Sequence, residues 1–235
     1  PHDAEAERLA REHVNLPCER HMLHLGADLR DEVARPKEPV VPNREDRERV
    51  FAEVVPRVWT LIDAAARADM NLTIDAEESD RLELSLDVFE ALAARIAAEL
   101  PQWRGFGLAV QAYQTRALDG VHEVARIARA HGLRFMVRLV KGAYWDGEIK
   151  RAQEAGLPGY PVFTHKQHTD ISYLACAQAL IGHADVIYPQ FATHNAFTIA
   201  AVTSLAGDRQ YEFQCLHGMG ETVYDQLVGA AGKGP

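Results

Sequence analysis

From about residue 70 onward, short apolar runs alternate with longer segments whose apolar side chains recur every three or four residues. The short runs are rich in β-branched and aromatic residues, which is typical of strands. They cover residues 70–74, 105–113, 134–140, 186–192 and 211–216. The longer segments between them have the periodicity of amphipathic helices. The chain therefore predicts a regular alternation of strand and helix.

This alternation predicts right-handed βαβ units and a parallel sheet, which is either open and doubly wound or closed into a barrel. No G-x-G-x-x-G or Walker A loop follows any of the strand-like runs, so the nucleotide-binding motifs typical of open sheets are absent. Polar residues collect after every strand, whereas an open sheet would gather them at one switch point. We therefore predict an α/β fold of the (β/α)8 TIM-like barrel type.

The first 45 residues have a different character. Residues 1–45 predict a helical arm followed by a Pro-rich charged linker, and residues 46–235 predict the barrel. Cys18, His21 and His24 are spaced by three residues in the arm. Only neighbouring members of that series would share a helix face, and a fourth ligand is not evident, so we expect no metal site there.

Composition narrows the class of protein. The chain has 235 residues with 47% hydrophobic and 25% charged, an ordinary globular composition. A net charge of −9 argues against a broad nucleic-acid surface. No apolar run approaches the roughly 20 residues of a membrane-spanning helix, and the charged N-terminal residues show no secretory signal. The three cysteines are dispersed, which fits a reducing compartment, so we expect a cytoplasmic protein.

The run RFMVRLVKGAYWD, residues 134–146, carries the densest candidate chemistry. Strand alternation places Met136, Arg138 and Val140 on one face. If that face lines a barrel interior, the cation of Arg138 needs an anion, a polar network or a ligand. Either a ligand or a structural ion pair with Asp75 or Glu212 would satisfy it.

The residues after this strand suit a flat ligand. Gly142 and Ala143 allow close approach to the backbone, and Tyr144 and Trp145 provide aromatic walls unless they are core aromatics. With the nearby cations, they suit a planar cofactor that gains negative charge, as a flavin does on reduction. Lys141 offers a different chemistry, because a strand-end amine can form a Schiff base in a lyase or aldolase barrel.

Two further positions have structural interpretations beside functional ones. Asn195, after His194, is a residue type common at helix N-caps. Cys176 lies among small and apolar residues and is expected to pack in the core, whereas Cys215 at a strand end is expected to line a pocket.

Several longer motifs occur in order along residues 45–225: IDAEESDRLELSLD, QAYQ, RLVKGAYWDGEIKRAQ, GYPVFTHK, TDISYLACAQAL, YPQFATHNA and YEFQCLHGMGE. Together they resemble the proline dehydrogenase domain of bacterial bifunctional proline utilization A flavoproteins. The resemblance implies a distorted (β/α)8 barrel that binds FAD. It also implies an oxidoreductase that converts L-proline to Δ1-pyrroline-5-carboxylate by hydride transfer to flavin N5, the first step of proline catabolism.

The resemblance also implies roles for individual residues and no metal. The implied catalytic residues are Asp75, Arg138 and Tyr144. The implied substrate contacts are Asp75, Tyr144 and Leu216. The implied cofactor contacts are Gln111, Arg138, Val140, Lys141, Gly142, Ala143, Trp145, Thr164, Lys166, Thr169, Thr193, His194, Asn195, Gln214 and Cys215. The implied partners are L-proline or a proline-like inhibitor and a quinone electron acceptor, with peripheral contact at the inner membrane face.

Parts of the family pattern have no counterpart in this sequence. The family binds the proline carboxylate with an Arg-Arg pair and a following Glu, and this chain contains no Arg-Arg dipeptide. The lysine of the family's first strand lies in a Lys-Leu-Ser setting that is missing before Val50. We therefore expect an incomplete barrel in which the first, seventh and eighth strands are not visible. A catalytically impaired fragment of the domain is the matching alternative.

Overall fold

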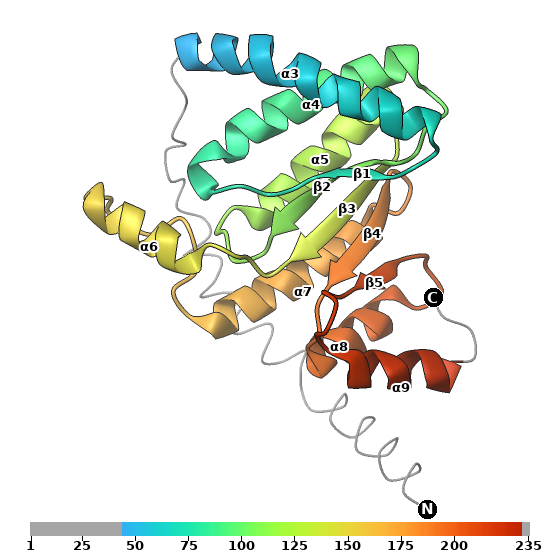
Figure 1. Cartoon of the computed structure of the whole chain (residues 1–235). Helices are drawn as coiled ribbons and strands as arrows, with labels where there is room; N and C mark the ends of the chain where they lie inside the picture. Colours follow the sequence, from blue (N-terminus) through green and yellow to red (C-terminus); the bar gives the residue numbers. More distant parts are fainter. Residues whose placement is uncertain (1–43, 232–235) are drawn as a thin grey trace, which may run out of the picture. The chain divides into compact units, whose positions relative to one another are not determined.

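The structure, a computed structural model, describes the backbone of residues 44–231 and the side chains of residues 47–227 (Figure 1). Within this part, five strands form one sheet in the order β1-β2-β3-β4-β5, and each neighbouring pair is parallel. The strands are β1 (Leu72–Ile74), β2 (Phe106–Gln111), β3 (Phe135–Val140), β4 (Ile187–Ala192) and β5 (Glu212–Gln214). All five predicted strands are confirmed.

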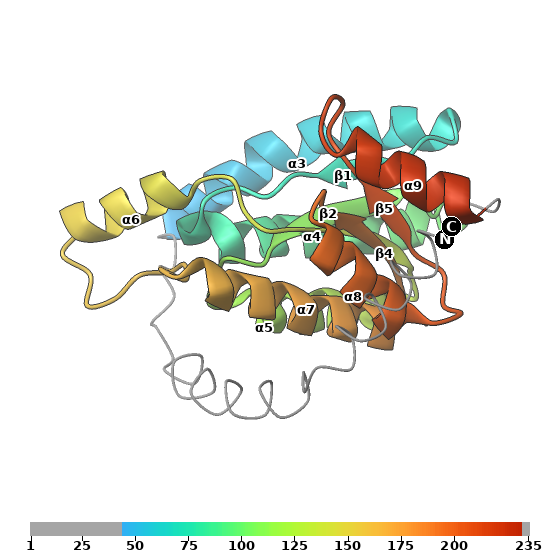
Figure 2. The same cartoon turned by 90° about the horizontal axis from the view of Figure 1, so that it is seen from below.

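Helices connect the strands in chain order. They are α3 (Arg44–Arg67), η1 (Ser79–Arg81), α4 (Leu82–Glu99), α5 (Ala117–His131), α6 (Trp145–Glu154), α7 (Lys166–Gly182), α8 (Ala196–Ala206) and α9 (Glu221–Ala231). Successive helices from α3 to α8, with α6 excepted, contact one another in series. Figure 2 shows α5, α7 and α8 side by side on one side of the strands.

Strand order separates the two sheet types that the sequence left open. A doubly wound sheet reverses its strand order at a switch point, whereas these five strands follow the sequence without reversal. Such an order, with the connecting helices in one layer, is the arc of a (β/α)8 barrel. The α/β class is confirmed. Residues 44–231 contain five strands in an open sheet.

The two faces of the sheet have different environments. Phe135, Val137 and Leu139 are buried under the helices, while Met136, Arg138 and Val140 are only partly buried on the opposite face. This confirms the predicted alternation along β3. We call that opposite face the inner face. By register it also contains Thr73, Gly107, Ala109, Gln111, Tyr188, Gln190, Ala192, Glu212 and Gln214.

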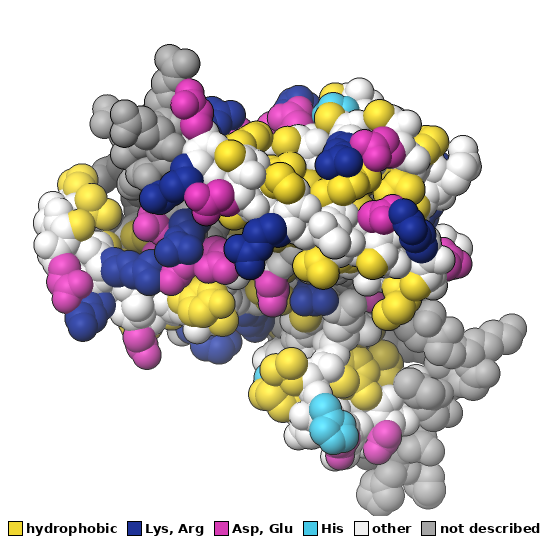
Figure 3. Space-filling view, turned by 45° about the horizontal axis from the view of Figure 1, so that its top comes forward, with side chains coloured by type: hydrophobic (Ala, Val, Ile, Leu, Met, Phe, Trp, Pro, Cys, Tyr) yellow, Lys and Arg dark blue, Asp and Glu magenta, His cyan; other side chains and the backbone are white. Residues whose placement is uncertain are grey.

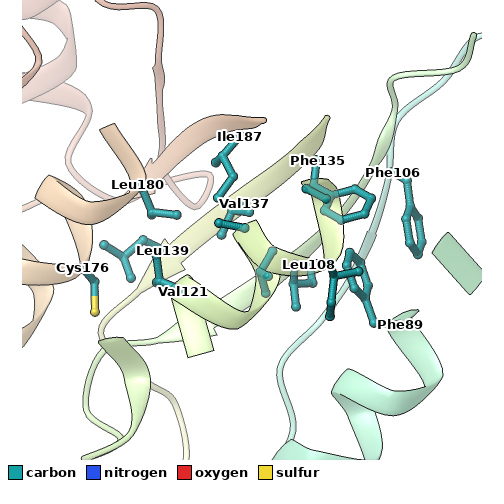
Figure 4. Packing of buried hydrophobic residues seen from close by; sticks show 14 of the residues in the cluster. Phe89, Phe106, Leu108, Val121, Phe135, Val137, Leu139, Cys176, Leu180 and Ile187 are labelled. Carbon is teal, nitrogen blue, oxygen red and sulfur yellow. The ribbon is translucent and has the colours of Figure 1, made fainter. Parts of the chain in front are cut away.

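The core lies between the other face of the sheet and the helices (Figure 4). Phe89 of α4 stacks on Phe106 with ring centroids 4.7 Å apart, and its ring meets Phe135 edge-on at the same distance. Cys176 of α7 is fully buried in this layer, where burial raises the pKa of its thiol to about 12. The predicted packing role of Cys176 is confirmed.

Pro189 is an unexpected residue for an internal strand, because it cannot donate a ladder hydrogen bond. It nevertheless lies within β4, in register with Val137 of β3. On its other side β4 pairs with β5 only from Gln190 onward. The position of Pro189 therefore borders a sheet edge, where a missing donor is tolerated.

The surface carries charges of both signs. Figure 3 shows Lys and Arg side chains beside Asp and Glu side chains on the face in view. Arg126, for example, pairs with both Glu90 and Glu123, and Arg129 pairs with Asp185. In residues 44–231 no helix combines the length and apolarity that crossing a membrane requires.

Candidate active site

Arg138 is the central side chain of the inner face. Its Nε donates a hydrogen bond to Gln214 Oε1 at 2.8 Å, and its Nη1 lies 3.7 Å from Asp75 Oδ1. The Asp75 side chain is 84% exposed, so this long ion pair contributes little. The predicted structural ion pair with Asp75 therefore exists but does not satisfy the guanidinium. No described residue bonds to Nη2.

Glu212 fixes the orientation of the Gln214 side-chain amide, whose oxygen accepts the hydrogen bond from Arg138. Gln214 Nε2 donates to Glu212 Oε1 at 2.6 Å, and Gln190 Nε2 donates to the same oxygen at 2.8 Å. A carboxylate only accepts hydrogen bonds, so the nitrogen of Gln214 must face Glu212 and its oxygen must face Arg138. The alternative pairing of Arg138 with Glu212 is thus realised indirectly, through Gln214.

Gln111 connects two loops at the C-terminal ends of the strands, which we call the mouth of the sheet. It is 3% exposed, donates from Nε2 to the carbonyl of Glu77 at 2.8 Å, and accepts from the amide of Ala143 at 3.2 Å. The amide oxygen and one N–H are therefore used within the protein. The second N–H of the side chain makes no hydrogen bond to a described residue.

The loop after β3 lies directly over an aromatic ring. Gly142 has a φ of 139°, and a Cβ at this position would lie 2.4 Å from Cγ of Tyr113. Tyr113 is 3% exposed, and burial, followed by the charge of Glu148, raises its pKa to about 12. The phenol therefore stays neutral, and its ring packs against the backbone of Gly142.

Tyr144 and Trp145 border a cavity of about 280 Å³ at this loop. Their side chains are 43% and 42% exposed, so the alternative of core aromatics is wrong. Trp145 Nε1 donates to the carbonyl of Phe163 at 2.9 Å, which anchors the indole while its ring stays accessible. The remaining lining residues are Glu78, Gly142, Ala143, Asp146, Gly147 and Arg151.

Lys141 belongs to a charged cluster with Lys166 and Asp170. Lys141 Nζ donates to Asp170 Oδ1, and Lys166 Nζ donates to Oδ2 at 2.6 Å. Burial opposes ionisation of Asp170, but the two ammonium groups outweigh it and lower the pKa of the carboxyl. The Lys141 ammonium is thus engaged in an ion pair with Asp170. This contact gives no support to the Schiff-base alternative.

Three predicted cofactor residues lie in or beside this cluster. Lys166 is the first residue of α7, with a 72% exposed side chain, and Thr164 is exposed in the preceding loop. Thr169, one turn into α7, is 8% exposed. The structure thus places two accessible groups and one buried group at the N-terminal end of α7.

Asn195 is a helix cap. Its Oδ1 accepts from the amide of Thr198 at 3.0 Å and from the Thr198 hydroxyl at 3.1 Å, at the start of α8. The backbone N–H of Asn195 donates to Thr193 Oγ1 at 3.1 Å. The capping alternative is therefore confirmed for Asn195. His194, between them, is exposed to solvent.

Replacing Asn195 with alanine should lower the free energy of unfolding by about 1 kcal/mol, because the first turn of α8 loses its side-chain acceptor. Asn195→Asp keeps an oxygen at the same position and should be close to wild type. Urea unfolding followed by circular dichroism measures both. Equal stability of Asn195→Ala and wild type would contradict the capping role.

The residues after β5 lie apart from the contacts described above. Cys215 is exposed, and the Leu216 side chain is 73% exposed. The described residues therefore do not enclose either side chain in a pocket. Among them, no cluster of three or more His, Cys, Asp and Glu side chains is arranged to bind a metal ion. Cys18, His21 and His24 lie outside the described residues.

The structure adds several residues to those predicted for the site. Asp170, Glu148 and Gln190 were missed, Tyr113 was expected only as one of the polar residues after its strand, and Glu212 was considered only as a direct partner of Arg138. Asp170 lies four residues after Lys166 on a helix, a spacing that predicts an ion pair. The contacts of Tyr113 and Gln190 depend on strand register and loop geometry, which leave no local signal in the sequence.

Comparison with known proteins identifies the family. Residues 6–234 match the family described as proline dehydrogenase. The chain belongs to the proline dehydrogenase family. The bifunctional protein PutA of Escherichia coli K12 is 52% identical over 196 residues, which is 82% of this chain and 15% of that protein. PutA of Rhizobium meliloti is 50% identical over 80% of this chain and 15% of its own length.

Solved structures of proline utilization A have the same arrangement of elements. A variant of the Bradyrhizobium japonicum protein superimposes with a TM-score of 0.77 at 56% identity, covering 79% of this chain and 19% of that one. A structure of proline utilization A with proline bound in remote sites gives a TM-score of 0.78 at 55% identity, with 80% and 19% coverage. This member of the proline dehydrogenase family thus spans less than a fifth of these relatives' lengths.

Proposed function

We propose that this chain is an FAD-dependent proline dehydrogenase domain that oxidises L-proline to Δ1-pyrroline-5-carboxylate. The observation that carries the proposal is the convergence of Arg138, Gln111 and the Lys141–Trp145 loop at the C-terminal mouth of a parallel sheet. Barrel enzymes keep their active sites at this end of the strands. Membership of the proline dehydrogenase family supports the same assignment.

The residues present fit a flavin. The guanidinium of Arg138 has a free Nη2 among the described residues, and the buried Oε1 of Gln190 on the same inner face has no described hydrogen-bond partner. The cavity beside Gly142 has aromatic walls and a backbone that lacks a Cβ. Lys141 and Lys166 supply positive charge for phosphates. Together these groups provide hydrogen bonds, a flat surface and cations.

We assign the cofactor roles accordingly. Arg138 would hold the reactive edge of the flavin, and Gln111 would bond the ring with its second N–H. The residues that would surround the phosphates and the adenosine are Thr164, Lys166, Thr169, Thr193, His194 and Asn195. Those that would surround the ring are Val140, Gly142, Ala143, Trp145, Gln214 and Cys215. For Asn195 the oxygen is already engaged, so its NH2 group is the part available to the cofactor.

Asp75 and Tyr144 would contact the substrate. Both side chains are exposed at the mouth, and Asp75 lies beside Arg138. When bound, FAD would supply the hydride acceptor that proline oxidation requires. The protein's part is to hold the substrate ring in a fixed orientation, which lowers the entropic barrier to transfer. Arg138 stabilises negative charge that develops on the acceptor.

The remaining assignments follow from the family resemblance and the composition. We propose a quinone as the final electron acceptor, a cytoplasmic location with peripheral contact at the inner membrane face, and L-proline or a proline-like inhibitor as ligand. We also propose residues 1–45 as an arm separate from the barrel of residues 46–235. The catalytically impaired alternative is tested by the same experiment as the activity.

The full chain reconstituted with FAD should be yellow, and L-proline added without oxygen should bleach the flavin absorbance. D-proline is the control, because its carboxylate points to the other face of the ring. A chain that takes up no FAD would contradict the cofactor assignment. A yellow chain that L-proline does not bleach would support the impaired alternative.

A further inference from the structure

Helix α6 is held to the rest of the protein by very few buried side chains. Only Glu148 and Ala152 of its ten residues are buried. Figures 1 and 2 both show α6 projecting away from the other helices, next to the ends of β2 and β3. A helix with so little apolar contact depends on polar contacts for its position.

Glu148 is the main polar contact. It is 3% exposed, and its two oxygens accept hydrogen bonds from the amide and the hydroxyl of Ser79, each at 2.6 Å. Ser79 lies 69 residues earlier in the chain, at the start of η1. A buried carboxylate is costly unless donors satisfy it, and hydrogen bonds to a charged group are stronger than neutral ones.

A second, weaker link runs beside the first. Arg151 of α6 bonds Glu78 Oε1 at 2.5 Å and lies 3.9 Å from Asp80. The Arg151 side chain is 49% exposed, and ion pairs that solvent reaches in this way contribute little. The hydrogen bond from Arg151 lowers the pKa of Glu78, but the buried Glu148–Ser79 contact is the one that solvent cannot replace.

The two segments joined by Glu148 carry the proposed substrate residues. The segment before Ser79 contains Asp75, and the carbonyl of Glu77 accepts the Gln111 amide. On the other side, the amide of Glu148 donates to the carbonyl of Tyr144, and α6 begins at Trp145. One buried carboxylate therefore connects both sides of the mouth.

We propose that Glu148 is a positioning residue that holds Asp75 and the Tyr144–Trp145 pair as one unit around the substrate. The proposal rests on the proposed function for its substrate, but the contact itself involves only this chain. Glu148 touches neither substrate nor cofactor in this account. It acts through Ser79 on one side and through the first turn of α6 on the other.

The first test uses the protein without FAD. In Glu148→Ala the Ser79 amide loses its acceptor, and its hydrogen exchange should speed up about 10–100-fold relative to wild type. Glu148→Gln should restore slow exchange, because its amide oxygen accepts from the Ser79 amide and its nitrogen donates to the hydroxyl. Glu154→Ala is the matched control, since Glu154 is an exposed glutamate on the same helix that pairs with Lys150.

The second test measures proline oxidation. In Glu148→Ala kcat/KM for L-proline should fall about 10–100-fold, mostly through KM, because the substrate residues lose their fixed positions. Glu148→Gln and Glu154→Ala should stay near wild type. A purely structural role would lower the melting temperature of Glu148→Ala while leaving KM unchanged, and that result would overturn the proposal.

Ser79→Ala keeps the result decisive if Glu148→Ala does not fold. This variant retains the backbone bond and loses only the hydroxyl bond, so its KM should be higher than that of wild type. A wild-type KM in Ser79→Ala, with unchanged hydrogen exchange of the backbone amide at position 79, would then overturn the proposal. If the wild-type chain oxidises no proline, the proposed function fails, while the exchange experiment still decides whether Glu148 joins the two segments.

Discussion

Replacing Arg138 with methionine should lower kcat for proline oxidation about 10²–10³-fold, because one charged donor to the developing negative charge is lost. The aliphatic stem of methionine keeps the packing beside Met136 and Val140 on the inner face. The variant should therefore fold and still bind FAD. Stopped-flow measurement of flavin bleaching by L-proline gives the rate of the chemical step separately from binding.

Arg104→Met is the matched control for this experiment. Arg104 is an exposed arginine that donates to the carbonyl of Pro101 at 2.9 Å, just before the N-terminal end of β2 and so at the opposite end of the strand from Gln111. Its bleaching rate should equal that of wild type. An Arg138→Met variant that bleaches as fast as Arg104→Met would contradict the assigned role of the guanidinium.

Replacing Gly142 with alanine should lower the free energy of unfolding by about 2–4 kcal/mol and abolish FAD uptake. The φ of 139° is unfavourable for any residue with a Cβ, and the added atom would meet the buried Tyr113 ring at 2.4 Å. Either the loop or the ring must move, and both border the proposed flavin site. Urea unfolding and FAD titration by fluorescence quenching measure the two effects.

Gly147→Ala provides the comparison within the same segment. Gly147 lies in α6, and a Cβ there would meet nothing within 4 Å. Alanine at an exposed helical position should leave stability unchanged or raise it by up to about 1 kcal/mol. If Gly142→Ala behaves like Gly147→Ala, then the close approach of the loop to Tyr113 is unimportant for the fold.

Periodicity alone was enough to predict the order and type of the elements. The alternation along β3 correctly separated Arg138 from the buried Val137 and Leu139, because a strand places successive side chains on opposite faces. The residue type of Asn195 correctly indicated a cap. These predictions succeeded because they depend on local backbone geometry, which the sequence encodes over a few residues.

Contacts between distant segments could not be predicted in the same way. Glu148 and Ser79 are 69 residues apart, and Gln214 and Arg138 are 76 apart. Each pairing depends on the register of the strands and on the path of a loop, which no local pattern specifies. The sequence therefore indicated which strand ends carry polar groups, but not which of those groups bond to one another.

The most direct test of the account is the structure of this chain crystallised with FAD. We expect the flavin ring on the inner face at the mouth of the sheet, with its N5 within hydrogen-bond distance of the Arg138 guanidinium and its edge at Gln111. A flavin ring bound elsewhere, with Arg138 still directed only to Gln214 and Asp75, would contradict the account.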